Sequence, residues 1–333
     1  MRVVITGGAG FLGTRLARAL LTRGRLRGRD GRDETIERMT LVDMAPPVAF
    51  SDPRVVAVTG DIADADLIER VVADDTASVF HLAAVVSGQA EADFDLGMRI
   101  NVDATRLLLD VCRVGPGRAS RPLRPTVIFT SSIAVYGGTL PDVVPEDAAV
   151  APQSSYGMQK AIGELLINDY TRKGFIDGRV LRLPTISVRP GRPNAAASSF
   201  ASTIIREPLN DEEAMCPVPP DTRLWLASPA TAVDCLIAAH DLSGQVLGSN
   251  RILNAPGISV TAGEMVDALA RVAGSRVAER VRWEHDPRIS AIVATWPRAL
   301  DVSRARALGL PGDEGVDAIV RRYIAEELPA WSG

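Results

Sequence analysis

The first 23 residues restrict the fold of this chain more than any other segment. Residues 2–6 (RVVIT) are apolar and mostly β-branched, which is typical of a buried strand. They run directly into a glycine-rich turn at 7–13 (GGAGFLG), and residues 14–23 carry apolar side chains at helical spacing. Such a turn lets the backbone approach a pyrophosphate closely, and the start of the helix offers it N–H groups. The alternative is an ordinary strand–helix connection. The pattern favours a dinucleotide site, with contacts from Gly7, Gly10, Phe11, Leu12 and Gly13.

Apolar runs alternate with helical stretches along much of the chain. Further strands are expected at 39–42, 55–58, 78–84, 126–130, 180–183 and 251–254, with helices near 65–72, 94–112 and after 154. This alternation predicts an α/β fold with a Rossmann-like, doubly wound parallel sheet. From Pro184 onward, Pro, Gly and Asn interrupt the pattern. We therefore expect a dinucleotide-binding domain at 1–183 plus about 230–255, and a smaller C-terminal substrate lobe at 184–229 plus 256–333.

Composition restricts the partners and the compartment. At 333 residues, with 46% hydrophobic and 23% charged residues, the chain can bury a sizeable core. A net charge of −4 argues against nucleic acid or an anionic membrane as a partner. No apolar run is long enough to span a membrane, and the N-terminal strand does not resemble a signal peptide. The three cysteines lack metal-ligand spacing, so we expect reduced core thiols, no metal and a cytoplasmic protein.

The ends of the next two expected strands carry carboxylates that suit the adenosine half of a dinucleotide. Asp43 ends the second strand, where an acidic side chain binds ribose hydroxyls and repels a 2′-phosphate. Its position predicts NAD, with NADP weaker; an exposed turn aspartate is the alternative. The charged segment 25–38 explains why Asp43 lies further along the sequence from Gly13 than in the usual fingerprint. Acidic residues in this segment offset its arginines, so we expect a solvated loop and not a nucleic-acid patch. Asp61 and Ile62 follow the third strand, where they can contact the adenine edge.

The fourth strand and the helix after it add four residues to the expected cofactor site: Leu82, Ala83, Ala84 and Asn101. His81 lies within an apolar run, which favours a core histidine over a catalytic one. Beyond it, Ala83 and Ala84 are small enough for the backbone to lie close to a ligand, and Leu82 precedes them at the same strand end. Asn101 falls inside an expected helix, where asparagine is unusual by propensity. We therefore expect its side chain to point inward and to form hydrogen bonds at the cofactor site.

Tyr156 and Lys160 lie one helical turn apart, so their side chains share one face of an expected helix. A free tyrosine ionises near ~10, but an adjacent ammonium and a positive nicotinamide ring would favour the phenolate. Tyr156 can then remove a proton from an alcohol as hydride leaves for NAD, while Lys160 also binds the nicotinamide ribose. Ser132 ends the fifth strand and can hydrogen-bond the substrate oxygen. A surface helix pair is the alternative, but the glycine turn and the Ser-Ser strand end favour catalysis.

Six segments together resemble the extended short-chain dehydrogenase/reductases, the NAD-dependent epimerase/dehydratase family. They are TGGAGFLG at 6–13, Asp61-Ile62, HLAA at 81–84, Asn101, TSSIAVYG at 130–137 and YGMQK at 156–160. The resemblance spans nearly the whole chain. It implies that Ser132 is the catalytic hydroxyl, that Tyr156 is the base and that Lys160 holds the ribose. It also implies a homodimer built through the helices that carry Asn101 and Tyr156.

Longer strings indicate the substrate. HLAAVVSGQAEADFDLGMRIN and CPVPPDTRLW are similar to a branch of the family that oxidises the C2 hydroxyl of a small sugar acid, D-erythronate, to 2-dehydro-D-erythronate with NAD. Such a substrate needs a cation or a cluster of donors for its carboxylate. Arg223 matches an arginine that many members place over the substrate, although surface or structural roles are the alternative for such arginines. The loop after the strand at 180–183 is expected to line the nicotinamide pocket through Pro184 and Ile186. The expected substrate-binding set is Ser87, Ser132, Tyr156, Thr185, Arg189, Asn194 and Arg223.

Two other functions fit parts of the same pattern. A nucleotide-sugar 4-epimerase shares the whole fingerprint, but it keeps its NAD bound and releases no NADH. A non-catalytic NAD-sensing protein would have lost the Ser, Tyr or Lys, and all three are present. Dehydratases of the family carry Thr-Asp-Glu where this chain has Ser132-Ile133-Ala134, so the acid pair needed for elimination is missing. A dehydrogenase therefore remains the first hypothesis.

Overall fold

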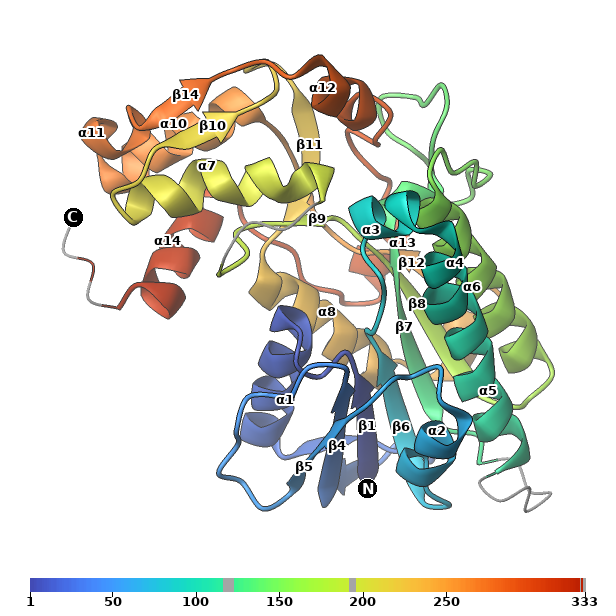
Figure 1. Ribbon diagram of the computed structural model, residues 1–333. Helices are drawn as coiled ribbons and strands as arrows, with labels where there is room; N and C mark the ends of the chain where they lie inside the picture. The colour runs from blue at the N-terminus through green and yellow to red at the C-terminus, as the bar shows by residue number, and fades with distance from the viewer. Residues whose placement is uncertain (116–122, 192–195, 330, 332–333) are drawn as a thin grey trace. The chain divides into compact units, whose positions relative to one another are not determined.

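The computed structural model describes residues 1–115, 123–191, 196–329 and 331 (Figure 1). The chain divides into two compact units. Unit 1 consists of Met1–Val135, Ser154–Arg182 and Val233–Leu253, and unit 2 of Tyr136–Gln153, Leu183–Ala232 and Asn254–Gly333. Residues 136–153, which we expected in the dinucleotide-binding domain, group with unit 2.

Contacts within unit 2 explain where residues 136–153 belong. The Tyr136 hydroxyl donates to Asn254 Oδ1 at 2.9 Å. Val144 forms an isolated parallel bridge with Leu300, and Arg304 Nη1 donates to Glu146 Oε1 at 2.6 Å. These partners are far away in sequence, so the local pattern of the segment could not reveal them.

A seven-stranded parallel sheet forms the centre of unit 1, in the order β12-β8-β7-β6-β1-β4-β5 (Figure 1). Because β1 lies between β4 and β6, the direction of winding reverses beside β1, and ligands bind such sheets at this point. The order confirms the doubly wound α/β fold. The strands are β1 (Arg2–Thr6), β4 (Arg38–Asp43), β5 (Val55–Thr59), β6 (Thr76–His81), β7 (Thr126–Ser132), β8 (Asp177–Leu183) and β12 (Ile252–Asn254).

Helices cover both faces of this sheet. Val79 of β6 belongs to a buried cluster with Leu108 of α5 and Ile167 of α6. Its neighbour Phe80 points the other way and stacks on His240 of α8, with ring centroids 5.4 Å apart. The helices of this unit are α1 (Phe11–Arg23), α2 (Ala65–Val71), α3 (Ser87–Ala92), α4 (Phe94–Gly97), the π-helix η1 (Met98–Asp103), α5 (Ala104–Val114), the 3₁₀ turn η3 (Ile133–Val135), α6 (Ser155–Arg172), the C-terminal part of α8 (Pro229–Asp241) and α9 (Gly244–Leu247).

Two expectations about unit 1 are wrong. The segment 25–38 is not a solvated loop, because β2 (Arg25–Arg27) and β3 (Asp33–Thr35) form an antiparallel hairpin. It buries Leu26 and Ile36 completely, and these two apolar residues hold the charged strands against the unit. The single helix expected at 94–112 is interrupted by the π-helix η1. One extra residue in a helical turn rotates the side chains that follow it, and such bulges are frequent at functional sites.

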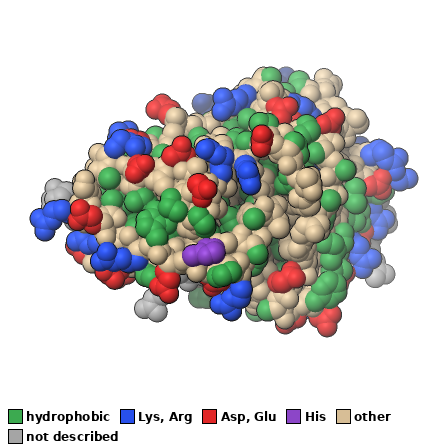
Figure 2. Space-filling view, turned by 90° about the horizontal axis from the view of Figure 1, so that it is seen from above, with side chains coloured by type: hydrophobic (Ala, Val, Ile, Leu, Met, Phe, Trp, Pro, Cys, Tyr) green, Lys and Arg blue, Asp and Glu red, His purple; other side chains and the backbone are tan. Residues whose placement is uncertain are grey.

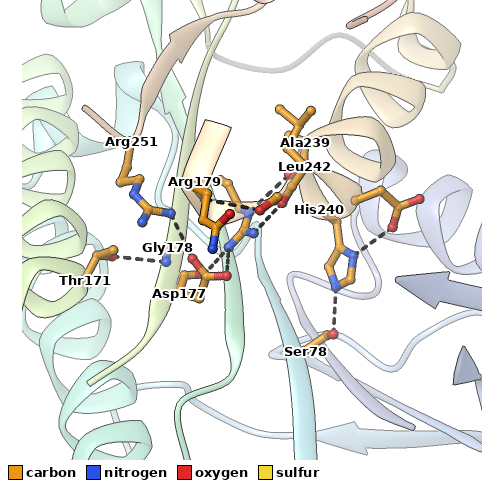
Figure 3. Close-up of polar contacts among 12 residues, drawn as sticks. Ser78, Thr171, Asp177, Gly178, Arg179, Ala239, His240, Leu242 and Arg251 are labelled. Carbon is orange, nitrogen blue, oxygen red and sulfur yellow. Dashed lines mark hydrogen bonds and ion pairs between the residues drawn. The ribbon is translucent and has the colours of Figure 1, made fainter. Parts of the chain in front are cut away.

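Figure 3 shows how α8 is anchored at the amino ends of the central strands. Arg179 of β8 is 2% exposed, and its guanidinium donates to the carbonyls of Ala239 at 3.2 Å and Leu242 at 2.6 Å. These are carbonyls at the end of the helix, where a cation is favourable. Asp177 Oδ2 pairs with Arg179 at 2.8 Å, and Asp177 Oδ1 with Arg251 at 2.8 Å. The cluster lies at the opposite end of the strands from the site described below.

Unit 2 has its own apolar core, built between α7, α10, α14 and a small sheet in the order β13-β11-β9. A capping box starts α10, since Glu264 N donates to Thr261 Oγ1 and Thr261 N donates to Glu264 Oε2. The elements are β9 (Thr185–Ile186), η4 (Ala197–Ser199), α7 (Phe200–Leu209), β10 (Ala214–Cys216), β11 (Arg223–Ala227), β13 (Ile258–Thr261), α10 (Ala262–Ala273), α11 (Ser275–Ala278), β14 (Val281–Trp283), α12 (Pro287–Val293), α13 (Ser303–Ala307) and α14 (Val316–Glu327).

Three general features concern the chemistry of the whole chain. Cys112, Cys216 and Cys235 are buried thiols outside any disulfide, as predicted, and burial raises the pKa of Cys112 to about 12. No helix in the described part of the chain is long and apolar enough to cross a membrane. On the face shown in Figure 2, side chains of both charge signs are interspersed.

Candidate active site

The glycine turn joins β1 to α1 at the carboxyl edge of the unit 1 sheet. Gly7 has φ +73°, and a Cβ at this position would lie 2.8 Å from Ala83 N. A Cβ on Gly13 would lie 2.1 Å from Gly7 O, so neither position accepts a larger side chain without rearrangement. Gly10 is the N-cap of α1 and offers no side-chain cap. The first turn of α1, with Phe11 and Leu12, therefore presents backbone to a ligand, which is the cradle that a pyrophosphate needs.

Asp43 closes the neighbouring strand end and is tied to the glycine turn. Its Oδ2 accepts from Ala9 N at 3.0 Å and its Oδ1 from Ala45 N at 3.2 Å. The carboxylate is half-buried at the end of β4. The chain thus holds an anion beside the turn, where the family pattern places the ribose-binding acid.

Asp61 and Ile62 follow β5, as expected, but Asp61 has a partner that the sequence did not reveal. Arg99 Nη1 of the π-helix donates to Asp61 Oδ2 at 2.6 Å, and Ala63 N donates to Asp61 Oδ1 at 2.9 Å. Burial opposes ionisation of Asp61, but these two donors outweigh it and lower its pKa. Ile62 is 5% exposed. A nucleotide base at this edge would therefore meet an ion pair instead of a lone carboxylate.

His81 links β1 to the π-helix through a chain of hydrogen bonds. Thr105 Oγ1 donates to Asn101 O at 2.8 Å, so it accepts from His81 Nε2 at 2.9 Å. His81 Nδ1 then accepts from Thr6 Oγ1 at 2.6 Å, and Thr6 Oγ1 accepts from Ala83 N at 3.3 Å. Burial first, and the Lys160 charge second, lower the pKa of His81 to about 3. His81 is 1% exposed, so the prediction of a core histidine is confirmed.

Asn101 points inward from the π-helix. Its Oδ1 accepts from Val85 N at 2.8 Å, while its Nδ2 donates to Val85 O at 3.0 Å and to Gln159 Oε1 at 2.7 Å. The amide therefore holds the irregular segment 82–85 that follows β6, and it also contacts Gln159, the residue next to Lys160. In the structure Asn101 supports the walls of the site through these bonds.

Tyr156 and Lys160 project from the first two turns of α6. Ser154 is the N-cap of α6, and its Oγ accepts from Gly157 N at 3.1 Å. Lys160 is 2% exposed, and its Nζ lies 4.8 Å from the centroid of the Phe129 ring and 5.7 Å from that of the Tyr156 ring. Burial lowers the pKa of Lys160 to about 8, and the charge of Glu164 works against this shift. A buried ammonium thus lies beside a half-buried phenol.

Ser132 is the last residue of β7, the strand against which α6 packs. Its Oγ accepts from Ala134 N at 3.1 Å, which uses a lone pair of the hydroxyl and not its proton. Ser132 is half-buried. Unit 1 therefore carries the serine, the tyrosine and the lysine on two packed elements at the carboxyl edge of the sheet.

The remaining predicted residues divide between the two units. Ser87 begins α3 in unit 1 and is half-buried. In unit 2, Arg189 Nε donates to Ile186 O at 3.2 Å, and Arg223 Nη1 lies 3.8 Å from Glu264 Oε2. Both arginines thus have contacts within their own unit. Pro184, Thr185 and Ile186 are buried in unit 2 around β9, whereas Asn194 lies outside the described residues.

Sequence reasoning missed Glu164 and Arg182, the buried ion pair behind the predicted catalytic residues. Glu164 follows Lys160 by one helical turn, and this spacing is the signal that could have revealed it. Arg182 lies in an apolar strand, where a charged residue is unusual and needs a partner.

The glycine cradle, the acid at the end of β4 and the Ser132/Tyr156/Lys160 set define a nicotinamide-dependent oxidoreductase of the Rossmann class. The chain belongs to the NAD dependent epimerase/dehydratase family, whose model matches residues 3–224. It is 58% identical to D-erythronate dehydrogenase of Cupriavidus necator over 98% of both chains, and 44% identical to that of Haemophilus influenzae over 98% of this chain and 100% of the relative. A solved nucleoside-diphosphate-sugar epimerase of Agrobacterium tumefaciens is 42% identical, covers 100% of this chain and 95% of its own, and superposes with a TM-score of 0.93.

Proposed function

We propose that this protein oxidises the C2 hydroxyl of D-erythronate to 2-dehydro-D-erythronate with NAD. One observation carries the proposal: a nearly fully buried Lys160 ammonium lies beside the Tyr156 ring on a face of α6 that packs on β7. A fold seldom buries a lysine ammonium for stability, because removal from water disfavours the charge. The two relatives named D-erythronate dehydrogenase supply the substrate.

Tyr156, Lys160 and Ser132 have different roles in this oxidation. Tyr156 as the phenolate takes the proton of the C2 hydroxyl, and the Lys160 ammonium stabilises that phenolate. At pH 7 a group with a pKa of about 8 is still mostly protonated, so Lys160 keeps its charge. Ser132 donates to the oxygen that becomes the carbonyl oxygen. NAD, when bound in the cradle of Gly7, Gly10 and Gly13, supplies the acceptor for the C2 hydride.

The cofactor is NAD in preference to NADP. Asp43 places a carboxylate at the end of β4, and two backbone N–H groups orient it. A 2′-phosphate on the adenosine ribose would meet this negative charge at short range. We assign Asp61, Ile62 and Arg99 to the adenine side of the same site, and Leu82–Ala84 and Asn101 to its wall.

We assign the substrate carboxylate to unit 2. The residues that support this are Arg189 and Arg223, which offer guanidinium groups, and Thr185, which offers a hydroxyl. In this assignment unit 1 serves as the NAD-binding domain and unit 2 as the substrate lobe.

A substrate screen tests the activity. D-erythronate and its stereoisomers are incubated separately with NAD or NADP, and NADH or NADPH absorbance is followed. We expect NADH with D-erythronate and NAD. One relative of known structure is named as an epimerase. The alternative is therefore a nucleotide-sugar 4-epimerase, which would give no net NADH but would convert a UDP-sugar to its C4 epimer. A non-catalytic NAD-sensing protein would do neither.

In this proposal the enzyme is a homodimer. It is located in the cytoplasm and belongs to carbohydrate metabolism. Leu165 is 67% exposed and Phe94 is 51% exposed, although both are large and apolar. Leu165 lies on α6, the helix that the family resemblance assigns to the subunit interface. The three buried thiols, which form no disulfide, suit a reducing compartment. Light scattering at micromolar concentration should give twice the 35.5 kDa chain mass; a monomer mass would refute the dimer.

A further inference from the structure

A buried, bidentate ion pair lies behind Tyr156 and Lys160 in unit 1. Glu164 Oε1 accepts from Arg182 Nε at 2.8 Å, and Glu164 Oε2 accepts from Arg182 Nη2 at 2.6 Å. The Glu164 side chain is 2% exposed and that of Arg182 is 5% exposed. Apolar residues of similar volume often replace such a pair with no loss of stability. Stability alone is therefore a weak reason for its presence here.

A third residue connects this pair to the strand end that carries Ser132. Ser131 Oγ donates to Glu164 Oε1 at 2.6 Å. Ser131 belongs to β7 and Arg182 to β8, and these strands are neighbours in the sheet. The Glu164 carboxylate thus connects α6 to the ends of both strands, beside the predicted catalytic serine.

Glu164 also acts on Lys160. The two residues lie one turn apart on α6, so their side chains share a face of the helix. Burial favours the neutral amine of Lys160, and the negative charge of Glu164 favours the ammonium. Removing that charge would leave Arg182 as an uncompensated cation near Lys160, which would favour the neutral amine further.

We propose that Glu164 is a positioning residue of the active site, which fixes α6 against β7 through Ser131 and Arg182 and keeps the Lys160 side chain an ammonium ion. The inference deepens the proposed function, because Lys160 serves the reaction only in its charged form. Glu164 is not itself a catalytic residue, since it acts through its neighbours.

Other charged groups around α6 have different roles. His81 of β6 faces Lys160, and burial keeps it neutral. On the π-helix, Arg99 is exposed and pairs with Asp61, and Asp103 is exposed. Two acidic residues lie on other helices near α6. Glu91 of α3 accepts from Ser155 N, and Asp110 of α5 pairs with Arg113. In the described part of the unit, Glu164 is the group whose charge raises the pKa of Lys160.

The sequence allows a direct measurement of Lys160. Lys160 and Lys173 are the only lysines in the chain, so lysine labelled with ¹³C at Cε gives two NMR signals per protomer. Lys173 is exposed at the end of α6 and serves as the internal reference. Lys173→Arg assigns the two signals. Both lysines are titrated in the full-length protein without substrate, so the result does not depend on which compound is oxidised.

Two single variants should shift the Lys160 midpoint in opposite directions. Glu164→Gln keeps an acceptor for Ser131 but removes the negative charge, and it should lower the midpoint by about one pH unit. Arg182→Met leaves the carboxylate without its cation and should raise the midpoint. The Lys173 midpoint should stay at its wild-type value in both. If Arg182→Met does not fold, the double variant Glu164→Gln/Arg182→Met removes both charges, and its midpoint should lie between those of Glu164→Gln and the wild type.

A purely structural ion pair would produce a different result. Loss of stability without a change in the Lys160 midpoint of Glu164→Gln would overturn the proposal, as would shifts in the same direction in both single variants. Failure of the wild type to oxidise D-erythronate would refute the proposed substrate. The Lys160 titration would still test the role of Glu164, because it is measured without substrate. A wild-type enzyme with the expected activity but an unshifted Glu164→Gln midpoint would refute the positioning role alone.

Discussion

Lys160 Nζ lies 4.8 Å from the centroid of the Phe129 ring, so the ammonium rests on the aromatic face that β7 presents to α6. Helix and strand approach closely here, since a Cβ on Gly163 would lie 2.5 Å from the Phe129 ring. The cation–π contact offsets part of the cost of burying the charge. The part of the burial cost that this contact does not offset lowers the free energy of unfolding.

Lys160→Met should stabilise the protein and abolish turnover. Burial lowers the pKa of Lys160 from 10.5 to about 8, so the folded state holds this proton less tightly than the unfolded chain. At pH 7 that difference corresponds to about 3 kcal/mol of destabilisation, an upper limit for the gain. Urea unfolding measures the gain, and Lys173→Met at the exposed lysine is the control. A Lys160→Met protein that is less stable than the wild type and still active would contradict the prediction.

Stability should fall in mildly acidic solution because of His81. Its pKa is about 3 in the folded protein and 6.5 in the unfolded chain. Between these two pKa values the unfolded chain binds more protons than the folded protein. The free energy of unfolding is therefore unaffected by His81 above pH 6.5 and decreases as the pH falls from 6.5 toward 3. The slope is at most about 1.4 kcal/mol per pH unit. Urea unfolding at several pH values should show a shallower dependence for His81→Gln, and an equal slope in both proteins would refute this assignment.

Asp43→Asn should weaken the discrimination between NAD and NADP. The amide oxygen can still accept from Ala9 N, but the charge that repels a 2′-phosphate is lost. We expect the ratio of kcat/KM for NAD over NADP to fall at least about tenfold, which corresponds to about 1.4 kcal/mol. Asp142→Asn, in a loop of unit 2, is the control for loss of one negative charge. An unchanged ratio would show that Asp43 does not face the ribose.

Much of unit 1 could be predicted because its signals are local. The strand at 2–6, the glycine turn and the helix start at Ser154 depend on short-range patterns of apolar, glycine and capping residues. Tyr156 and Lys160 could be found for the same reason, since a spacing of four residues places both on one helix face.

The features that escaped prediction depend on partners distant in sequence. The π-helix at Met98–Asp103 is held by Asn101, which contacts Val85 and Gln159. The Glu164–Arg182 pair joins a helix to a strand across the sheet, and Arg99 reaches Asp61 from another element. No periodicity in a single segment encodes such contacts. The assignment of 136–153 to unit 2 has the same origin.

Turnover of D-erythronate by the wild type and by Tyr156→Phe tests the central claim most directly. Phenylalanine keeps the ring beside Lys160 but removes the hydroxyl that takes the proton. With NAD, the wild type should produce NADH, and the variant should be slower by about 10²–10⁴-fold. NAD affinity, measured by calorimetry, should change little. NADH formation by Tyr156→Phe at the wild-type rate, or none by the wild type with D-erythronate, would contradict the account.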